Sequence, residues 1–273
     1  MGQVIALEAA AAGAAAIRPA EAGDLAACGA AMYEGFRDIA TRHGFAPDFP
    51  DPATAEGLLR HLHATPGFDG FVAERDGAAM GRVFVSRRSP VGGISVITVD
   101  PRAQDRAVGR GLMQHAMAHL SREGHPRQQL VQAAYHNRSL SLYAKLGFAA
   151  TEVLSNMTGP PIREAIPGRT VRPATAADLE RCNELCRRVH GFDRAGEVAS
   201  AIAAGGATVV EHEARVTGYT TGVGFTGHGV GERTEDVQAL IAAADGFAGP
   251  GILIPTRNAK LFRWCLDRGL RVV

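Results

Sequence analysis

The sequence predicts an α+β protein made of two tandem copies of one unit, each with a mixed, mostly antiparallel central sheet flanked by helices. Three observations predict this fold. A segment recurs in the second half, short β-branched runs alternate with amphipathic helical stretches, and two of the runs flank a tight-turn signal. The 273 residues suffice for two ordinary domains, and 46% hydrophobic against 21% charged residues is typical of chains that form apolar cores.

The clearest repeat pairs residues 17–28 (IRPAEAGDLAAC) with residues 171–182 (VRPATAADLERC), at an offset of 171 − 17 = 154 positions. A second echo pairs residues 137–148 with residues 258–270. Each of these segments begins with Asn, continues as an apolar-periodic helix, and ends with Gly followed by an apolar residue. A turn-rich stretch with three prolines, 159–168, separates the two halves.

The repeats divide the chain into an N-terminal extension over 1–16, a first domain over 17–158, a linker over 159–168 and a second domain over 169–273. The Ala-rich extension has no Lys or Arg before its apolar part and contains Glu8, unlike a signal peptide. We therefore expect a cytoplasmic protein with a frayed or helical N-terminal extension.

Each expected element of the first half has a local signal. Asp24 lies near the start of the first long helix, Asp76–Gly77 indicates a hairpin turn, and Pro101 stops a β-branched strand. Apolar residues at helical spacing mark 112–123, and Gly147 is suited to a helix C-cap. In order, we expect a strand ending at Arg18–Pro19, helices over 24–42 and 53–63, two strands around the hairpin turn, a strand over 93–99, a helix over 112–123, a strand over 129–135, a helix over 139–146 and a strand over 149–154.

Charge and hydropathy argue against two classes of partner. Lys+Arg number 29 and Asp+Glu 28, so a net charge of +1 disfavours nucleic-acid binding through bulk positive charge. Mean hydropathy is −0.03, and the sequence has no apolar run of the length that a membrane span needs. The four cysteines are scattered, so we expect buried thiols and no metal, with Cys182 and Cys186 on one helix face.

The segment 99–113 carries the most chemical information. A strand ends at Pro101, a loop of small and basic residues follows, and a helix opens near Gly109. Successive backbone amides and a helix N-terminus together form a site for phosphate oxygens. Small residues in this loop let a ligand approach the backbone, and Arg106 and Arg110 would add charge-assisted contacts.

The order strand, Val-x-Pro, Gln-x-x-small-x-Gly, helix resembles the acetyl-CoA signature of the GCN5-related N-acetyltransferases, the GNAT superfamily. Gln104, Ala107 and Gly109 stand at the motif positions, and Ala107 replaces the family's usual Gly. The family's second signature, Asn-x-x-small-x-x-Tyr-x-x-x-Gly-Phe, is similar to a segment of this chain that starts at Asn137. The matching residues there are Asn137, Tyr143, Gly147 and Phe148, with Leu140 at the small position.

Each of these features alone also has a structural interpretation. Gly109 and Gly111 would merely begin a helix, Tyr143 would be a core aromatic beside Leu142, and Asn137 would be an N-cap. Taken jointly and in this order, they favour the cofactor interpretation. The resemblance covers about residues 17–158.

The resemblance implies acetyl-CoA as co-substrate and no metal. It places the pantetheine arm in a gap between the strand ending at Val99 and a strand over 130–135, with an oxyanion-stabilising backbone N–H near Val99. It makes Tyr143 the general acid for the leaving thiolate, because a phenol, with a reference pKa of about 10, stays protonated at neutral pH. The residues that it assigns to cofactor binding are Ile97, Thr98, Val99, Gln104, Asp105, Arg106, Ala107, Val108, Gly109, Arg110, Gly111 and Asn137.

The general base stays open at the sequence level. The strand 94–99 has no carboxylate, where many family members carry a Glu. A water relay or Glu34 would serve instead, although Glu34 also reads as a solvated helix residue. Segment 32–52, rich in aromatic residues and charges, is the expected acceptor wall, and packing of a helix corner is the alternative for most of its side chains.

The second half is expected to be degenerate. Its stretch between the two anchors is 33 positions shorter than in the first half (119 − 86), and its Gly-rich segment 222–231 lacks the phosphate-loop pattern with basic neighbours. Trp264, six residues after Asn258, stands where the first half has Tyr143 and has no ionisable proton. We expect no acetyl-CoA turnover in this half.

The resemblance therefore implies an N-acetyltransferase that transfers an acetyl group from acetyl-CoA to a primary amine by direct attack in a ternary complex. The amine acceptor is a small molecule or a protein amine. A non-catalytic acyl-CoA sensor is the alternative, because the cofactor strand has no carboxylate. A purely structural partner protein with a closed cleft is a third reading.

Overall fold

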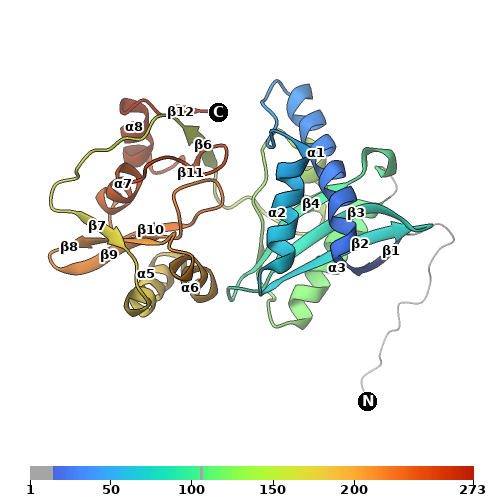
Figure 1. Cartoon of the computed structure of the whole chain (residues 1–273), viewed down its shortest axis with the longest axis horizontal. Helices are drawn as coiled ribbons and strands as arrows, with labels where there is room; N and C mark the ends of the chain where they lie inside the picture. Colours follow the sequence, from blue (N-terminus) through green and yellow to red (C-terminus); the bar gives the residue numbers. More distant parts are fainter. Residues whose placement is uncertain (1–14, 105–106) are drawn as a thin grey trace, which may run out of the picture. The chain divides into compact units, whose positions relative to one another are not determined.

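The computed structural model describes residues 15–104 and 107–273. Contacts group the chain into two compact units, and Figure 1 labels most of their helices and strands. The first comprises the residues up to Arg87 and Gly92–Gly147, and the second comprises Arg88–Val91 and Phe148–Val273. The predicted extension over 1–16 lies outside the described residues up to position 14.

The first unit contains a five-stranded sheet in the order β1-β2-β3-β4-β5. All neighbouring strands pair antiparallel except β4 and β5, which pair parallel, so the predicted mixed, mostly antiparallel sheet is confirmed. The predicted hairpin is also confirmed, since Asp76 and Gly77 both have positive φ (53° and 73°), as a two-residue turn requires. The strands are β1 (Ala16–Pro19), β2 (Phe68–Arg75), β3 (Ala78–Ser86), β4 (Gly92–Val99) and β5 (Gln128–Gln129).

Helices cover both faces of this sheet. Met32 and Leu59 pack with Val72 and Phe84 on one face, so α1 and α2 form one layer. On the other face lies α3, because a Cβ added to Gly81 would come within 3.1 Å of Leu112 Cδ1. The helices are α1 (Leu25–Arg42), α2 (Pro52–Ala64), α3 (Val108–Arg122) and α4 (Asn137–Lys145), with short 3₁₀ turns η1 (Ala22–Asp24) and η2 (Pro101–Ala103).

The second unit repeats this element order around two small sheets, and most of its helices and strands are shorter than their counterparts. One sheet has the order β10-β9-β8-β7, and the other has the order β11-β6-β12. Cys182 and Cys186 share the buried face of α5, as predicted. The elements are β6 (Leu154–Thr158), β7 (Thr170–Pro173), η3 (Ala176–Asp178), α5 (Leu179–His190), α6 (Ala195–Ala203), β8 (Thr208–His212), β9 (Arg215–Thr220), β10 (Gly229–Gly231), α7 (Thr234–Ala242), β11 (Ile252–Pro255), α8 (Ala259–Asp267) and β12 (Arg271–Val272).

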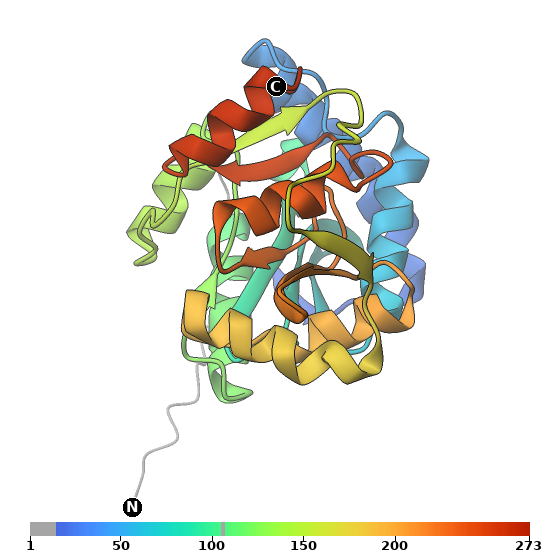
Figure 2. The same cartoon turned by 90° about the vertical axis from the view of Figure 1, so that its left-hand side faces the viewer.

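Strand β6 belongs to the second unit by its pairing. The predicted strand over 149–154 is wrong, because the strand begins at Leu154 and runs to Thr158. It lies between β11 and β12, antiparallel to both, and Figure 2 shows it alongside β11. Met157 is fully buried in the core of that unit. A segment that the repeat pattern attached to the first half therefore completes a sheet of the second.

The repeated Arg-Pro-Ala-x-x-x-Asp motif has a structural purpose. Arg18 forms a two-point ion pair with Asp24 (2.8 Å for each hydrogen bond) and donates to Glu74 on β2. Asp24 also accepts the backbone N–H of Glu21, which closes a capping box. The second unit repeats the arrangement, with the same distances for the two-point pair, through Arg172, Asp178, Glu211 and Thr175.

Among the described residues, the structure has no helix that combines the length and the apolar character required to cross a bilayer.

Candidate active site

One edge of β4 is left open by a bulge. Val83 pairs with Ile97 and Val85 with Ile94, so two residues of β4 stand opposite one residue of β3. Bulges increase the local twist of a strand and turn it away from its neighbour. On its other side, β4 pairs with β5 only through its first two residues, Gly92 and Gly93. Within the described parts of the chain, the rest of this edge has no strand partner, so its backbone groups are available to a ligand.

The predicted strand over 129–135 is therefore wrong for most of its length. Strand β5 ends at Gln129, and residues 130–136 leave the sheet as irregular backbone. Because β4 diverges at its bulge, the chain after Gln129 has no ladder to continue. The gap expected between the end of β4 and residues 130–135 is consistent with this divergence.

The loop after β4 leads into the start of α3, which no side chain of the described residues caps. Ala107 is the N-cap residue and has a left-handed backbone (φ 59°, ψ 6°), which costs a residue with a Cβ about 1 kcal/mol. A Gly at this position would avoid that cost. The first hydrogen bond of the helix runs from the Gly111 N–H to the Ala107 carbonyl at 3.0 Å.

Helix geometry leaves the N–H groups of Val108, Gly109 and Arg110 without intrahelical acceptors. Ala107 gives no side-chain cap, and the first turn of α3 has no acidic residue. These three amides and the helix dipole therefore form a preorganised site for an anionic group. Asp105 and Arg106, also assigned to this loop, lie outside the described residues.

Gly109 marks the point where β4, α3 and α4 converge. A Cβ added there would lie 3.4 Å from Val99 Cγ2 and 3.7 Å from Leu142 Cδ2. Beside this point is a surface hollow of about 460 Å³ with three cationic side chains and no acidic one. Its lining residues are Arg110, Asn137, Arg138, Ser141, Leu142 and Lys145.

Gln104 and Thr98 are held by side-chain contacts. The Arg138 Nη1–H donates to Gln104 Oε1 at 2.9 Å, which connects α4 to the loop after β4. Thr98 is buried with its methyl group toward α1, since a Cβ added to Gly35 would lie 3.4 Å from its Cγ2. Any ligand contact of Thr98 would thus be through its backbone.

Arg82 is a buried residue that the sequence analysis did not identify. It is only 1% exposed, donates to the Cys28 carbonyl and lies 3.4 Å from Thr98 Oγ1. Burial lowers the pKa of Arg82 to about 10, so it stays charged at neutral pH. It fixes β3 to the start of α1 behind the open edge of β4. An Arg in the apolar run of β3 was the only signal in the sequence.

Tyr143 projects from the buried face of α4 and is 7% exposed. Burial raises its pKa, and a hydrogen bond with the Ser139 side chain partly offsets this rise. The phenol is therefore protonated at neutral pH and able to donate. Asn137 is the first helical residue and is exposed, so the N-cap interpretation of Asn137 is wrong: the N-cap is His136.

Aromatic rings surround the residues just before α4. Phe45 stacks on Tyr135 with centroids 4.5 Å apart, and Phe36 contacts Phe49 edge-on at 5.7 Å. The expected acceptor wall thus faces the chain that follows β5. Glu34, in contrast, is exposed and forms an ion pair with Arg37 on the surface of α1.

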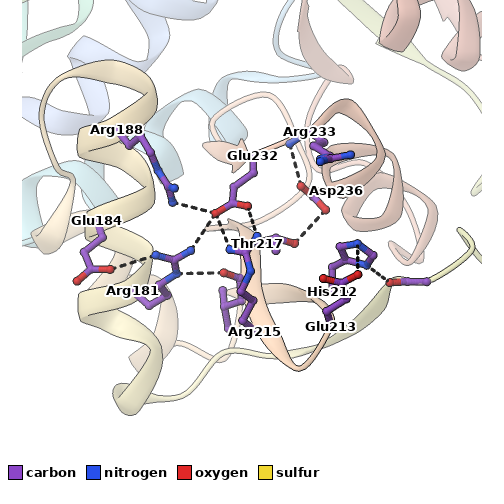
Figure 3. Close-up of polar contacts among 12 residues, drawn as sticks. Arg181, Glu184, Arg188, His212, Glu213, Arg215, Thr217, Glu232, Arg233 and Asp236 are labelled. Atoms are coloured by element: carbon purple, nitrogen blue, oxygen red, sulfur yellow. Dashed lines mark hydrogen bonds and ion pairs between the residues drawn. The ribbon is translucent and has the colours of Figure 1, made fainter.

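The second unit closes the corresponding strand–helix junction with its own side chains. Only Glu232 and Arg233 separate β10 from α7, whereas eight residues, 100–107, separate β4 from α3. Asp236 is fully buried and accepts the Arg233 backbone N–H at 2.8 Å, as Figure 3 shows. The same carboxylate accepts hydrogen bonds from Arg169 (2.6 Å) and Thr217 (2.9 Å).

A second carboxylate, that of Glu232, lies in the short loop between β10 and α7. Glu232 accepts hydrogen bonds from three arginines, Arg181, Arg188 and Arg215, each at 2.8–2.9 Å (Figure 3). These contacts, that with Arg215 above all, lower the pKa of Glu232 to about 2. This junction therefore already holds an internal anion in place of a phosphate.

Helix α8 corresponds to α4 but lacks its phenol. Asn258 is the N-cap, and its side chain accepts the Leu261 N–H at 3.1 Å. Counted from the two N-caps, Cys265 takes the position of Tyr143, and Trp264 takes that of Leu142. The pairing of Trp264 with Tyr143, which rests on aligning the two asparagines, is therefore one residue out of step. Burial raises the pKa of the Cys265 thiol to about 11.

Comparisons with known proteins agree on one class. Residues 31–148 match the family model described as the acetyltransferase (GNAT) family. Mycothiol acetyltransferase of Thermomonospora curvata is 36% identical over 107 residues, 38% of this chain and 36% of that protein. The mycothiol acetyltransferase of Cellulomonas flavigena is 37% identical over 117 residues, 38% of this chain and 33% of that protein. The chain thus spans about a third of the length of these curated relatives.

A solved structure matches nearly the whole chain. A Pyrococcus horikoshii protein designated an acetyltransferase superposes with a TM-score of 0.70, covering 96% of this chain and 86% of that one at 16% identity. At this identity the match shows a shared fold.

Proposed function

We propose that the first unit transfers an acetyl group from acetyl-CoA to a primary amine, because residues 31–148 match the family model described as the acetyltransferase (GNAT) family. One observation carries the proposal: the open edge of β4, the uncapped start of α3, and α4 with its phenol converge at Gly109. Each of these parts has a distinct use in binding or cleaving a nucleotide-linked thioester.

The chain's own groups fit such a ligand. The amides of Val108, Gly109 and Arg110 would receive the pyrophosphate, and the hollow with Arg138 and Lys145 beside them supplies positive charge. The open edge of β4 from Ile97 to Val99 would pair with the amide groups of the pantetheine arm. Asn137 lines this hollow, Gln104 accepts a hydrogen bond from Arg138 beside it, and Gly111 lies in the first turn of α3, so these three residues would add supporting contacts.

Tyr143 would act as the general acid. Its phenol is held protonated by burial, so it can donate to a thiolate that leaves the acetyl carbon. An amine attacks that carbon directly in the ternary complex, and a β4 backbone N–H near Val99 would stabilise the oxyanion. The thioester itself supplies the activated acetyl group.

The second unit would not bind acetyl-CoA at its corresponding junction. Asp236 closes the start of α7, and Glu232 holds the adjacent arginines. An incoming pyrophosphate would face these carboxylates, and like charges at a helix start disfavour binding. We infer that the second unit serves as a structural partner of the catalytic one.

A non-catalytic acyl-CoA sensor is the second candidate. The observation in its favour is that Ile94–Val99 has no carboxylate and that Glu34 lies exposed in a surface ion pair. Such a protein would bind acetyl-CoA and release no thiol.

Binding and turnover separate these candidates. Thermal unfolding with millimolar acetyl-CoA measures binding, and colorimetric detection of free CoA across a panel of primary amines measures transfer. The panel should include the acceptor of mycothiol acetyltransferases, because the curated relatives carry that activity in their names. Stabilisation with CoA release supports transfer, stabilisation without release from any amine supports the sensor, and no stabilisation contradicts both.

A further inference from the structure

The N-cap of α4 departs from the pattern of its counterpart. In α8 the N-cap is Asn258, whose side chain accepts the Leu261 N–H at 3.1 Å. In α4 it is His136, and its side chain makes no capping hydrogen bond. Asn is among the preferred N-cap residues and His is not. The first unit thus forgoes a stabilising cap at this position, as proteins do at functional sites.

The His136 ring is bonded on one side only. Its Nδ1 lies 3.1 Å from Ser139 Oγ, while its Nε2 is buried and has no hydrogen-bond partner among the described residues. Buried polar atoms in native proteins nearly always have partners, so this nitrogen calls for an explanation. A ligand group with a proton to give would supply the missing partner.

Ser139 connects this ring to the phenol. Ser139 Oγ lies 3.1 Å from His136 Nδ1, and the Ser139 side chain also lies close enough to the phenol to lower the pKa of Tyr143. The three residues are spaced by three and four positions, which places them on one face of α4. The Ser139 hydroxyl is therefore placed between the imidazole and the proposed general acid.

Two aromatic side chains lie next to the His136 imidazole. Phe36 from α1 and Tyr135 from the preceding loop lie with centroids 6.1 and 6.0 Å from it. The titratable groups that face this cluster are His43 at the end of α1 and Asp48, which acts on Tyr135. Burial, reinforced by His43, lowers the pKa of His136, so the ring is neutral at pH 7.

Other candidate bases are placed less well. Glu34 is exposed and paired with Arg37. Burial raises the pKa of Asp48, but the residue near this cluster that Asp48 interacts with is Tyr135 and not Tyr143. His43 is exposed to solvent. Of these groups, only His136 combines a buried, unpartnered nitrogen with a connection to Tyr143.

We propose that His136 is the general base that deprotonates the acceptor amine, and that Ser139 relays protons between it and Tyr143. This inference rests on the proposed acetyl transfer. The nitrogen–carbon bond forms as Nε2 accepts a proton from the attacking nitrogen, and the carbon–sulfur bond breaks as Tyr143 protonates the sulfur. Nδ1–H passes its proton to Ser139, and the Ser139 hydroxyl passes its own to the phenolate. The cycle thus ends with amide, free thiol, and Ser139 and Tyr143 as they began, while the imidazole proton has moved from Nδ1 to Nε2. Proton exchange with solvent restores the starting tautomer before the next turnover.

The test is His136→Asn, which removes the base and installs the cap residue found in α8. We expect thermal stability equal to or above that of the wild type, unchanged acetyl-CoA affinity, and a kcat lowered about 10²- to 10⁴-fold. The acidic limb of the pH–rate profile should disappear, and added imidazole should restore part of the rate. His61→Asn, at an exposed position of α2, is the matched control, and we expect it to leave kcat, the pH–rate profile and acetyl-CoA affinity unchanged.

The possible outcomes distinguish a failure of the proposed role of His136 from a failure of the proposed acetyl transfer. A wild type that transfers acetyl groups, with a variant whose kcat and pH profile are unchanged, overturns the role of His136 and leaves the proposed function intact. A wild type that transfers to no amine overturns both. Should His136→Asn fail to fold, Ser139→Ala, which keeps the imidazole but breaks the relay, must lower kcat without changing acetyl-CoA affinity, and an unaltered kcat contradicts the proposal.

Discussion

The β4–α3 and β10–α7 junctions show how one scaffold came to differ in its two copies. Both units keep the Arg–Asp pair that fixes the first strand to the first helix, Arg18 with Asp24 and Arg172 with Asp178. At the junction, the first unit has a loop of eight residues and an uncapped helix start, whereas the second has two residues and a buried Asp236. The scaffold contacts are thus independent of how the junction is built, and in the second unit a carboxylate occupies the helix start where we propose that the first unit receives a phosphate.

The largest expected effect tests the closed junction. Asp236→Asn removes the charge that holds Arg169 and the start of α7, and we expect the free energy of unfolding of the second unit to fall by about 3–5 kcal/mol. Urea denaturation followed by circular dichroism measures it. Asp245→Asn is the control, since that side chain is 99% exposed. A change equal to that of the control would mean that Asp236 does not hold the junction.

Tyr143 tests the chemical difference between α4 and α8. Tyr143→Phe removes only the donor, so kcat should fall about 10²- to 10⁴-fold while acetyl-CoA affinity stays the same. Steady-state kinetics and calorimetric titration measure the two quantities, with Tyr219→Phe in the core of the second unit as the control. Equal losses of kcat and affinity would indicate that the phenol only packs.

Gly109 sharpens the comparison at the open junction. Valine would place its side chain against Val99 and Leu142, where a bare Cβ already meets atoms at 3.4 and 3.7 Å. Because a hydrogen bond to a charged group contributes about 1.5–3 kcal/mol, we expect Gly109→Val to weaken acetyl-CoA binding at least about tenfold. Gly57→Val, in α2 with open space around it, controls for helix propensity. Unchanged affinity would place the ligand elsewhere.

The smallest expected effect tests what the two units share. The guanidiniums of Arg18 and Arg172 lower the pKa values of Asp24 and Asp178 below the usual range. A carboxyl group whose pKa is lower in the folded than in the unfolded chain stabilises the fold when the pH is above its unfolded pKa. This stabilisation is lost as the pH falls below about 4. Asp24→Asn and Asp178→Asn should each flatten the acid side of the stability profile by a similar amount, about 1 kcal/mol or less. Unequal flattening would show that the scaffold contacts have diverged too.

Local features of the sequence predicted much of this structure. The Arg-Pro-Ala-x-x-x-Asp repeat identified two units because it encodes an ion pair and a capping box within a few residues. The hairpin at Asp76–Gly77, and the end of α4 at the left-handed Gly147 that follows the C-cap Leu146, depend on backbone conformations that these residues favour. The loop before α3 could be recognised because small residues are required where a ligand meets the backbone.

Non-local features could not be predicted. Leu154–Thr158 pairs with Ile252–Pro255, and a pairing across about a hundred positions has no local pattern. The early end of β5 depends on a bulge in its neighbour. The unpartnered nitrogen of His136 is a property of its surroundings, so residue type alone gave no sign of it.

The central claim is that the start of α3, and not the start of α7, receives the phosphates of acetyl-CoA. Backbone amide NMR of the uniformly labelled chain, titrated with acetyl-CoA, tests it most directly. We predict saturable shifts at Val108, Gly109, Arg110 and Gly111, with Arg233, Thr234 and Asp236 unchanged. Shifts centred on residues 232–236, or none at 108–111 under saturating ligand, would contradict the account.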